Sequence, residues 1–190
     1  MTRSIIFRSI ETKQKIADDP EMIKRIDTAA QTITRCLQAG GRVFFCGNGG
    51  SAADAQHLAA ELSGRFYLDR PPLPAEAVHT NTSFITAVSN DYSFTEAYAR
   101  YIRAHGKAGD TLIAISTSGT SGNILKAVEC AKEMKMTTIG LTGITGGKMK
   151  NMVDLLLAVP SDDTPRIQEA HILIGHIICE IIERNIFGKT

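Results

Sequence analysis

Short apolar stretches alternate along this chain with longer segments in which apolar residues recur at helical spacing. The short stretches predict buried strands at 43–46, 75–79, 111–115, 137–141 and 154–159. The periodic segments between them predict helices at about 50–62, 82–89, 93–105 and 123–134. Strands that alternate with helices form a parallel sheet covered on both faces. We therefore expect an α/β fold, a three-layer α/β/α sandwich around a five-stranded parallel sheet.

The chain also begins and ends with helices that a minimal α/β unit does not need. A weakly amphipathic helix is predicted over 3–17, and a second begins where Asp19 suits the N-cap and Pro20 the first helical position. We expect these two helices to pack across a subunit interface. A long terminal helix, from Pro165 to about Ile186, is apolar on nearly all sides, so we expect it to be buried or to lie in oligomer contacts. The expected layout is a single domain over 1–190, with a helical extension at 1–40 and an α/β core at 41–190.

Composition narrows the class of protein. Of the 190 residues, 43% are hydrophobic and 22% are charged, which is ordinary for a globular protein. A net charge of +1 provides little attraction for nucleic acid or an anionic membrane, and no apolar run approaches the ~20 residues of a membrane span. The four cysteines form no CxxC pair and are expected to be buried thiols. Because the N-terminus lacks a signal-peptide core, we expect a cytoplasmic protein without nucleic-acid or membrane partners.

The first candidate site is the turn Gly47-Asn48-Gly49-Gly50-Ser51, between the first strand and the next helix. A strand that ends in such a turn presents free backbone N–H groups and the positive end of a helix, which bind anions. The turn matches neither G-x-G-x-x-G nor G-x-x-x-x-G-K-[ST], so it resembles a nucleotide site only loosely. A tight turn without a ligand is the alternative.

The second candidate site is the hydroxyl-rich loop Ser116-Thr117-Ser118-Gly119-Thr120-Ser121, again between a strand and a helix. Hydroxyls, backbone N–H groups and a helix N-terminus suit a phosphate monoester. The loop offers no lysine for a γ-phosphate, and no aspartate for Mg²⁺ follows a neighbouring strand. A sugar phosphate therefore fits better than a nucleotide, and a serine-rich cap without a ligand is the alternative.

Two further groups of polar side chains lie on predicted helices. His57 and Glu61 are four residues apart and share one helical face. On the terminal helix, Gln168 can share a site with His171 or His176, and spacing does not choose between the two histidines. A lone histidine is more often a core residue than a ligand. Polar residues in so apolar a helix nevertheless favour a function, because burying them without partners costs free energy.

Several motifs together resemble a known family. The runs CGNGGSAADAQHLAAELSGR, SNDY, ISTSGTSGN, LTGITGGKM and RIQEAHILIGHIICEII look like those of sedoheptulose 7-phosphate isomerases (phosphoheptose isomerases), a group within the SIS (sugar isomerase) domain family. The resemblance implies a flavodoxin-like SIS fold. It also implies interconversion of D-sedoheptulose 7-phosphate and D-glycero-D-manno-heptose 7-phosphate, the first step toward nucleotide-activated heptose for lipopolysaccharide. Members are cytoplasmic homotetramers with sites at subunit interfaces and, where zinc is bound, one ion per subunit.

The resemblance also implies roles for individual residues, and it selects His176 over His171 by likeness, not by geometry. The implied zinc ligands are His57, Glu61, Gln168 and His176. The implied substrate contacts are Asn48, Gly49, Gly50, Ser51, Glu61, Asn90, Asp91, Gln168, and the phosphate-binding Ser116, Thr117, Ser118 and Ser121. Pro165 departs from an aspartate seen there in some members.

The implied reaction moves a proton between adjacent carbons through an enediol, so it needs a base, an acid and stabilisation of the enediolate oxygens. We expect Glu61 to transfer the carbon-bound proton and His176 to shuttle protons at the oxygens, with zinc as a Lewis acid. A zinc ligand is a poor free base, so these two roles of Glu61 conflict. The alternatives are a non-catalytic SIS tetramer that binds a replication initiator protein, and an isomerase or sensor for a hexose phosphate.

Overall fold

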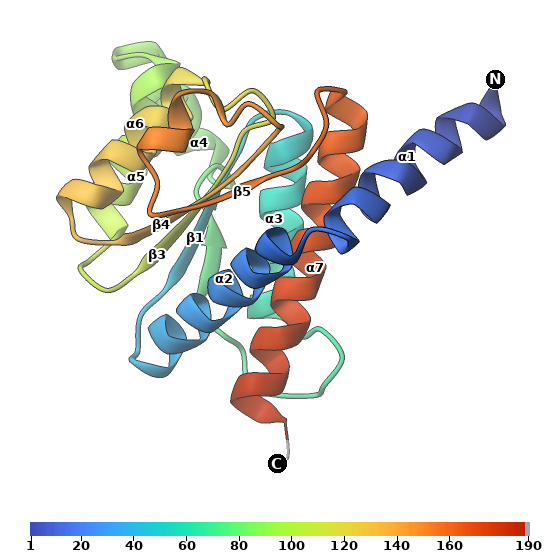
Figure 1. Ribbon diagram of the computed structural model, residues 1–190. Coiled ribbons are helices and arrows are strands. Elements are labelled where there is room, and N and C mark those ends of the chain that lie inside the picture. Colours follow the sequence, from blue (N-terminus) through green and yellow to red (C-terminus); the bar gives the residue numbers. More distant parts are fainter. Residues whose placement is uncertain (189–190) are drawn as a thin grey trace.

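The fold is built on a parallel sheet of five short strands. In the computed structural model, which describes residues 1–188, they are β1 (Val43–Cys46), β2 (Ala75–Ala77), β3 (Thr111–Ile115), β4 (Thr137–Thr142) and β5 (Leu155–Ala158). They pair in the order β2-β1-β3-β4-β5, and all neighbours are parallel (Figure 1). This is the flavodoxin-like order. The expected three-layer α/β fold with a five-stranded parallel sheet is confirmed.

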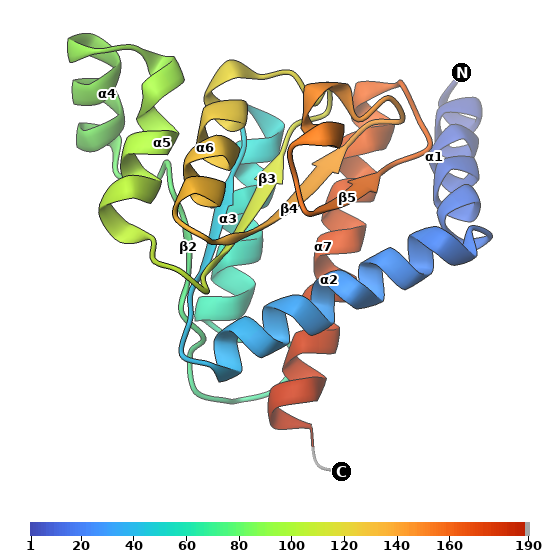
Figure 2. The ribbon, with the colours of Figure 1, turned by 60° about the vertical axis from the view of Figure 1, so that its left-hand side comes forward.

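Helices cover both faces of the sheet because successive strand residues point to opposite sides. Phe45 and Ile113 pack into a core cluster with α2 (Pro20–Gln38), α3 (Gly50–Ser63) and α7 (Thr164–Phe187). Phe44 and Leu112 pack into a second cluster with α4 (Thr82–Asp91), α5 (Phe94–His105) and α6 (Gly122–Glu133). The two helical layers stand on either side of the strands in Figure 2.

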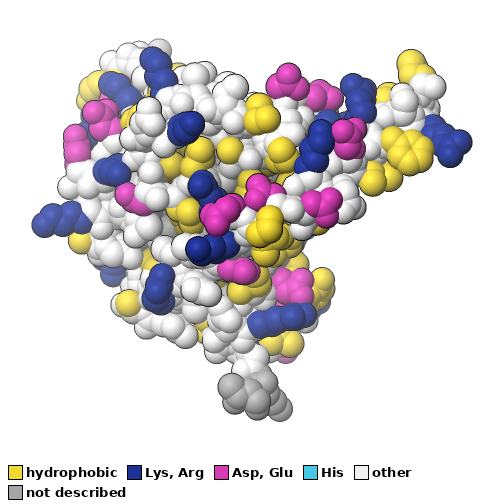
Figure 3. Space-filling model, in the orientation of Figure 1, with side chains coloured by type: hydrophobic (Ala, Val, Ile, Leu, Met, Phe, Trp, Pro, Cys, Tyr) yellow, Lys and Arg dark blue, Asp and Glu magenta, His cyan; other side chains and the backbone are white. Residues whose placement is uncertain are grey.

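The N-terminal helices form where the sequence predicts them. α1 (Thr2–Ala17) ends just before Asp19, whose carboxylate accepts the Glu21 N–H at 2.9 Å and caps α2. α1 projects from the body of the molecule (Figure 1). Its side chains Ile6, Phe7 and Ile10 are each more than half exposed. Apolar side chains are visible on this projecting end in Figure 3. The surface is the kind that a partner chain covers.

The loop after β4 buries a residue that its neighbours in sequence do not mark. Two lysines flank Met149, a pattern that predicts a solvated turn, but the structure forms a 3₁₀ helix there, η1 (Gly147–Asn151), in which Met149 is fully buried. The Met149 N–H donates to the Gly119 carbonyl at 3.1 Å. One apolar residue between two lysines gives no periodic signal, so this contact between two loops could not be read from the pattern.

The remaining expectations about burial concern the cysteines and the terminal helix. All four cysteines are free thiols, and all are buried, as expected. α7 buries Ile174, Ile178 and Ile182 in the first core cluster, while Ile177 and Ile181 are only partly buried. Within residues 1–188, no helix has both the length and the apolar character to span a membrane.

Candidate active site

The candidate site begins at the carboxyl ends of β1 and β3, which are neighbours in the sheet. Strand order reverses at this point of an open parallel sheet, and ligands bind in the crevice that results. The turn after β1 is tight: Gly49 has a φ of +56°, and a Cβ on Gly47 would collide with the Ser51 backbone. Within residues 1–188 no side chain caps α3, so its N-terminus is open to a ligand.

A pair of asparagine side chains joins this turn to the first turn of α6, which follows the loop after β3. Asn48 Nδ2 donates to Asn123 Oδ1 at 2.9 Å, and Asn123 Nδ2 donates to Asn48 Oδ1 at 2.8 Å. The Tyr98 hydroxyl of α5 donates to the Gly47 carbonyl at 2.9 Å, and burial raises the pKa of Tyr98 to about 12. The side chain of Asn48, an expected substrate contact, thus holds the two loops together in this structure.

The loop after β3 gathers hydroxyl groups at the N-terminus of α6. Ser116 Oγ lies 3.2 Å from Ser121 Oγ. Ser118 Oγ accepts hydrogen bonds from the N–H and the hydroxyl of Thr120, at 3.2 and 3.0 Å. Gly119 turns the chain with a φ of +64°, and no side chain within the described residues caps α6. Hydroxyls and an open helix N-terminus are the groups that bind a phosphate.

A hollow of about 310 Å³ lies beside this loop. Thr117 and Ser118 line it together with residues of the loop after β4 and the start of α7, including Ile144 and Thr164. The Thr117 carbonyl accepts the Gly143 N–H at 2.9 Å, which fixes the two loops relative to each other. The hollow is therefore a preformed space next to the hydroxyl groups.

His57, Glu61 and His176 meet where α3 lies beside α7. His57 Nε2 is 3.0 Å from Glu61 Oε1 and 3.2 Å from His176 Nε2. One ligand atom from each residue lies within 4.8 Å of the others. Ligand atoms that surround a tetrahedral zinc ion at about 2.1 Å are about 3.4 Å apart, so this donor set fits zinc. All three residues belong to one chain.

Close packing of the two helices makes this meeting possible. A Cβ on Gly175 would overlap the side chain of Leu58, so only glycine lets the helices approach this closely. His57 precedes Leu58 and His176 follows Gly175, so both histidines lie at the level along the two helices where the helices approach each other. The ring centroids are 5.0 Å apart in an edge-on arrangement.

The cluster is open on one side and borders a buried carboxyl on the other. The side chains of His57 and Glu61 are 49% and 24% exposed. Asp54, one turn before His57, has a buried oxygen with no hydrogen-bond partner in the described part of the chain. Burial raises the pKa of Asp54 to about 6, and the nearby His57 opposes the shift. A carboxyl whose charged form is disfavoured by burial thus lies beside the cluster.

The two histidines of α7 lie in different environments. His171 is fully buried, and its Nε2–H donates to the Thr142 carbonyl at 3.1 Å. Burial lowers the pKa of His171 to about 4, so the ring stays neutral and serves the core. His176 is partly exposed and contacts His57. The geometry therefore places His176, not His171, at the cluster.

The other expected site residues lie elsewhere. Gln168 packs its amide against Gly50, at the first turn of α3, about two helical turns from the contact between His57 and His176. It borders the glycine turn, and its place among the metal ligands stays a prediction. Asn90 and Asp91 are exposed at the end of α4, where Asn90 Nδ2 donates to Asp91 Oδ1 at 2.9 Å. Their contact with substrate stays a prediction too.

Comparison with known proteins decides the family. Residues 10–143 match the SIS domain family. The phosphoheptose isomerase of Clostridium acetobutylicum is 51% identical over 184 residues, which cover 97% of this chain and 94% of that protein. The chain belongs to the phosphoheptose isomerase family. The Rhodospirillum rubrum phosphoheptose isomerase is 56% identical over 158 residues, 83% of this chain and 84% of that protein. A solved phosphoheptose isomerase from Francisella tularensis superimposes with a TM-score of 0.91 at 43% identity, with 96% of each chain covered.

Sequence reasoning missed three residues that support this phosphoheptose isomerase site. Asn123 and Tyr98 fix the glycine turn, and Arg70 bonds the backbone of Glu61 at 2.8 Å. Asn123 follows the hydroxyl loop directly, so its amide was the one available signal. Tyr98 and Arg70 reach the site from other elements, and no local pattern marks them.

Proposed function

We propose that this chain interconverts D-sedoheptulose 7-phosphate and D-glycero-D-manno-heptose 7-phosphate, at the start of nucleotide-activated heptose synthesis for lipopolysaccharide or related glycans. One observation carries the proposal. In a chain about half identical to proteins named phosphoheptose isomerase, a carboxylate and two histidines converge between α3 and α7, and a hydroxyl loop at a helix N-terminus offers a separate anion site. That combination supplies a base, an acid and an anion site, which an aldose–ketose isomerisation of a sugar phosphate needs.

In this proposal the loop after β3 holds the phosphate. Ser116, Thr117, Ser118 and Ser121 offer hydroxyl and backbone donors, and the N-terminus of α6 adds its dipole. The glycine turn from Asn48 to Ser51, with Gln168 against it and Asn90 and Asp91 beyond, receives the sugar hydroxyls. The Asn48–Asn123 amide pair fixes the distance between the two binding loops.

Proton transfer falls to Glu61 and His176. Glu61 Oε1 is the oxygen that faces His57, and no hydrogen bond to Oε2 occurs within residues 1–188. The free oxygen takes the proton from one carbon and returns it to the neighbouring carbon. His176, whose Nε2 points into the same cluster, moves the proton between the two oxygens of the enediol. The conflict between holding a metal and acting as a base is resolved if the two oxygens divide these tasks.

Zinc fits the donor set and, when bound, supplies a Lewis acid that polarises the carbonyl. His57, Glu61 and His176 would hold it, one ion per subunit. Gln168 lies about two helical turns away within the chain, so it would serve as the fourth ligand only from a neighbouring subunit. His57 has no part in proton transfer in this proposal. Its Nε2 faces both Glu61 and His176, so it holds these two side chains in position.

The proposal includes a cytoplasmic homotetramer with shared sites, in which residues 1–40 extend a single SIS domain. Glu61 lies eleven residues beyond Gly50, about 16 Å along α3. This separation favours a substrate that is held by the loops of one subunit and meets Glu61 of another. The exposed side chains of Ile6, Phe7 and Ile10 on α1 supply apolar surface for subunit contacts.

A coupled assay that compares seven-carbon and six-carbon ketose phosphates tests the activity. We expect turnover of sedoheptulose 7-phosphate and at least tenfold lower kcat/KM for fructose 6-phosphate. Preference for the hexose phosphate would reassign the substrate, and turnover of neither would favour a binding protein. Mixing inactive Glu61→Gln and Ser118→Ala subunits tests shared sites: hybrid oligomers should regain activity, and a mixture that stays inactive would place each site within one chain.

A further inference from the structure

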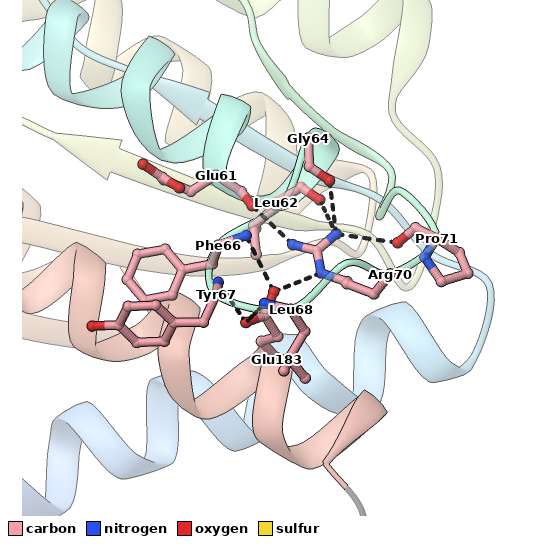
Figure 4. Close-up of polar contacts among 9 residues, drawn as sticks. All are labelled: Glu61, Leu62, Gly64, Phe66, Tyr67, Leu68, Arg70, Pro71 and Glu183. Atoms are coloured by element: carbon pink, nitrogen blue, oxygen red, sulfur yellow. Dashed lines mark hydrogen bonds and ion pairs between the residues drawn. The ribbon is translucent and has the colours of Figure 1, made fainter.

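A buried ion pair outside the proposed catalytic cluster joins the end of α3 to α7 (Figure 4). Arg70 Nε lies 2.9 Å from Glu183 Oε1, and both side chains are 2% exposed. A buried pair is weak evidence for a role in stability, because desolvation of two charges offsets much of their attraction. The backbone groups that Arg70 and Glu183 bind indicate another role for the pair.

Arg70 completes the last turn of α3. Its Nη2 donates to the Glu61 carbonyl at 2.8 Å, and its Nη1 donates to the carbonyls of Leu62 and Gly64 at 2.8 and 3.2 Å. The last carbonyls of a helix have no partner within the helix, and α3 has no basic residue of its own in that turn. Arg70 supplies both the donors and the charge from the loop, at the residue that carries the proposed base.

Glu183, on α7, binds the loop that follows α3. Its carboxylate accepts three consecutive backbone N–H groups, from Phe66 at 3.1 Å, Tyr67 at 2.8 Å and Leu68 at 2.9 Å. Burial raises the pKa of Glu183, but these N–H groups and Arg70 outweigh burial and lower it overall. These hydrogen bonds hold the backbone of Phe66, and the centroid of its ring lies 5.8 Å from that of His176.

We propose that Arg70 and Glu183 are positioning residues for the isomerisation: Arg70 places Glu61 through its backbone, and Glu183 places His176 through Phe66. Both side chains are buried and so lie out of reach of a substrate. Misplacement of a reacting group by about 1 Å can lower a rate about 100-fold, so a small shift of the last turn of α3 matters. The inference rests on the proposed function, since it takes Glu61 and His176 as the groups that move protons.

Arg70→Lys separates charge from geometry. Lysine keeps the positive charge beside Glu183 but lacks the planar fork that reaches several carbonyls at once. We expect the variant to fold, with kcat about 10- to 100-fold lower and KM changed less than about threefold. Wild-type kcat in a folded Arg70→Lys variant would overturn the inference, because charge compensation alone would then suffice.

Glu183→Gln gives a second test, and two control variants exclude a general loss of stability. Ile102→Ala removes a fully buried side chain from the opposite core cluster, and Arg103→Lys makes the same change in an exposed ion pair. We expect both controls to keep kcat, including Ile102→Ala when its loss of stability in urea matches that of Glu183→Gln. Equal losses of kcat in Ile102→Ala and Glu183→Gln would overturn the positioning role.

Zinc affinity, measured by competition with a chelator, gives a readout that does not depend on turnover. Displacing Glu61 and His176 should weaken zinc binding about 10- to 100-fold in Arg70→Lys and Glu183→Gln, and leave it unchanged in both controls. If wild-type protein turns over no sugar phosphate, the proposed function fails and the positioning role in isomerisation fails with it. If wild type is active and the variants match it in kcat and zinc affinity, only the positioning role fails.

Discussion

Two acidic side chains beside the same pair of helices lie in opposite environments. Glu61 pairs with His57 in a contact whose side chains are 24% and 49% exposed, and one of its oxygens has no hydrogen bond within the described residues. Glu183 pairs with Arg70 at 2% exposure, and both of its oxygens accept hydrogen bonds. About two turns of α7 separate Glu183 from His176, which completes the open cluster.

The difference shows how one fold can hold both a rigid and a reactive carboxylate. A carboxylate with all its partners in place, in surroundings of low dielectric, exchanges neither protons nor ligands easily. A carboxylate with one free oxygen at the surface can do both. The buried Arg70–Glu183 pair therefore holds the structure in place, whereas the partly exposed His57–Glu61 pair can exchange protons and ligands.

The largest expected effect comes from Glu61→Gln. The amide cannot accept the carbon-bound proton, so kcat should fall at least about 100-fold. Stability to urea, measured with chelator present, should change by less than about 1 kcal/mol, because the partly exposed pair contributes little. Coupled turnover and urea unfolding of the same preparation measure both. Turnover at the wild-type rate would remove Glu61 from the mechanism.

The same substitution at Glu183 should lower the free energy of unfolding much more than Glu61→Gln does. Glu183→Gln leaves the Arg70 charge buried without its partner, so unfolding free energy should fall by about 3–5 kcal/mol at pH 7. Because the pKa of Glu183 is lowered in the fold, its contribution is present above the unfolded pKa of about 4.3 and is lost as pH falls below it. The urea midpoints of variant and wild type should therefore differ at pH 7 and converge as pH falls from about 4.3 through the lower folded pKa. A constant difference would mean that the carboxylate charge is not what stabilises the pair.

The His57–Glu61 pair could be predicted from the sequence, whereas the Arg70–Glu183 pair could not. His57 and Glu61 are one helical turn apart, so periodicity alone places them on one face. Arg70 and Glu183 are 113 residues apart, and Asn48 and Asn123 are 75 apart. Contacts of that separation depend on how the helices pack, and a single sequence carries no local sign of them.

The sheet was predictable for a similar physical reason. Buried parallel strands must be short and apolar on both faces, so they stand out between amphipathic helices. Met149 shows the limit: its burial depends on the meeting of two loops, and its lysine neighbours point to solvent exposure. The choice between His171 and His176 lay beyond spacing too, since burial against Thr142 decides it.

The buried His171, which contrasts with the partly exposed His176, should make stability depend on pH. Its pKa is lowered from 6.5 to about 4, so the unfolded chain takes up a proton that the fold excludes. Stability therefore falls as pH drops from 6.5 to 4, by about 3 kcal/mol from this group. We expect His171→Gln to gain about that amount relative to wild type between pH 7 and pH 4. Comparing the two proteins cancels the opposite contribution of Asp54, and an unchanged difference across this range would mean that His171 is protonated in the fold.

The smallest effect on stability, with a clear effect on metal, is expected from His57→Ala. The side chain is half exposed, so the metal-free protein should lose less than about 1 kcal/mol in urea unfolding with chelator present. Zinc content of purified protein should nevertheless drop, because His57 Nε2 is the atom that faces both Glu61 and His176. His105→Ala, an exposed histidine on α5, should leave zinc content unchanged. Full activity of wild type after exhaustive chelation would instead show that the open cluster moves protons without a metal, and His57 would then serve to orient the other two side chains.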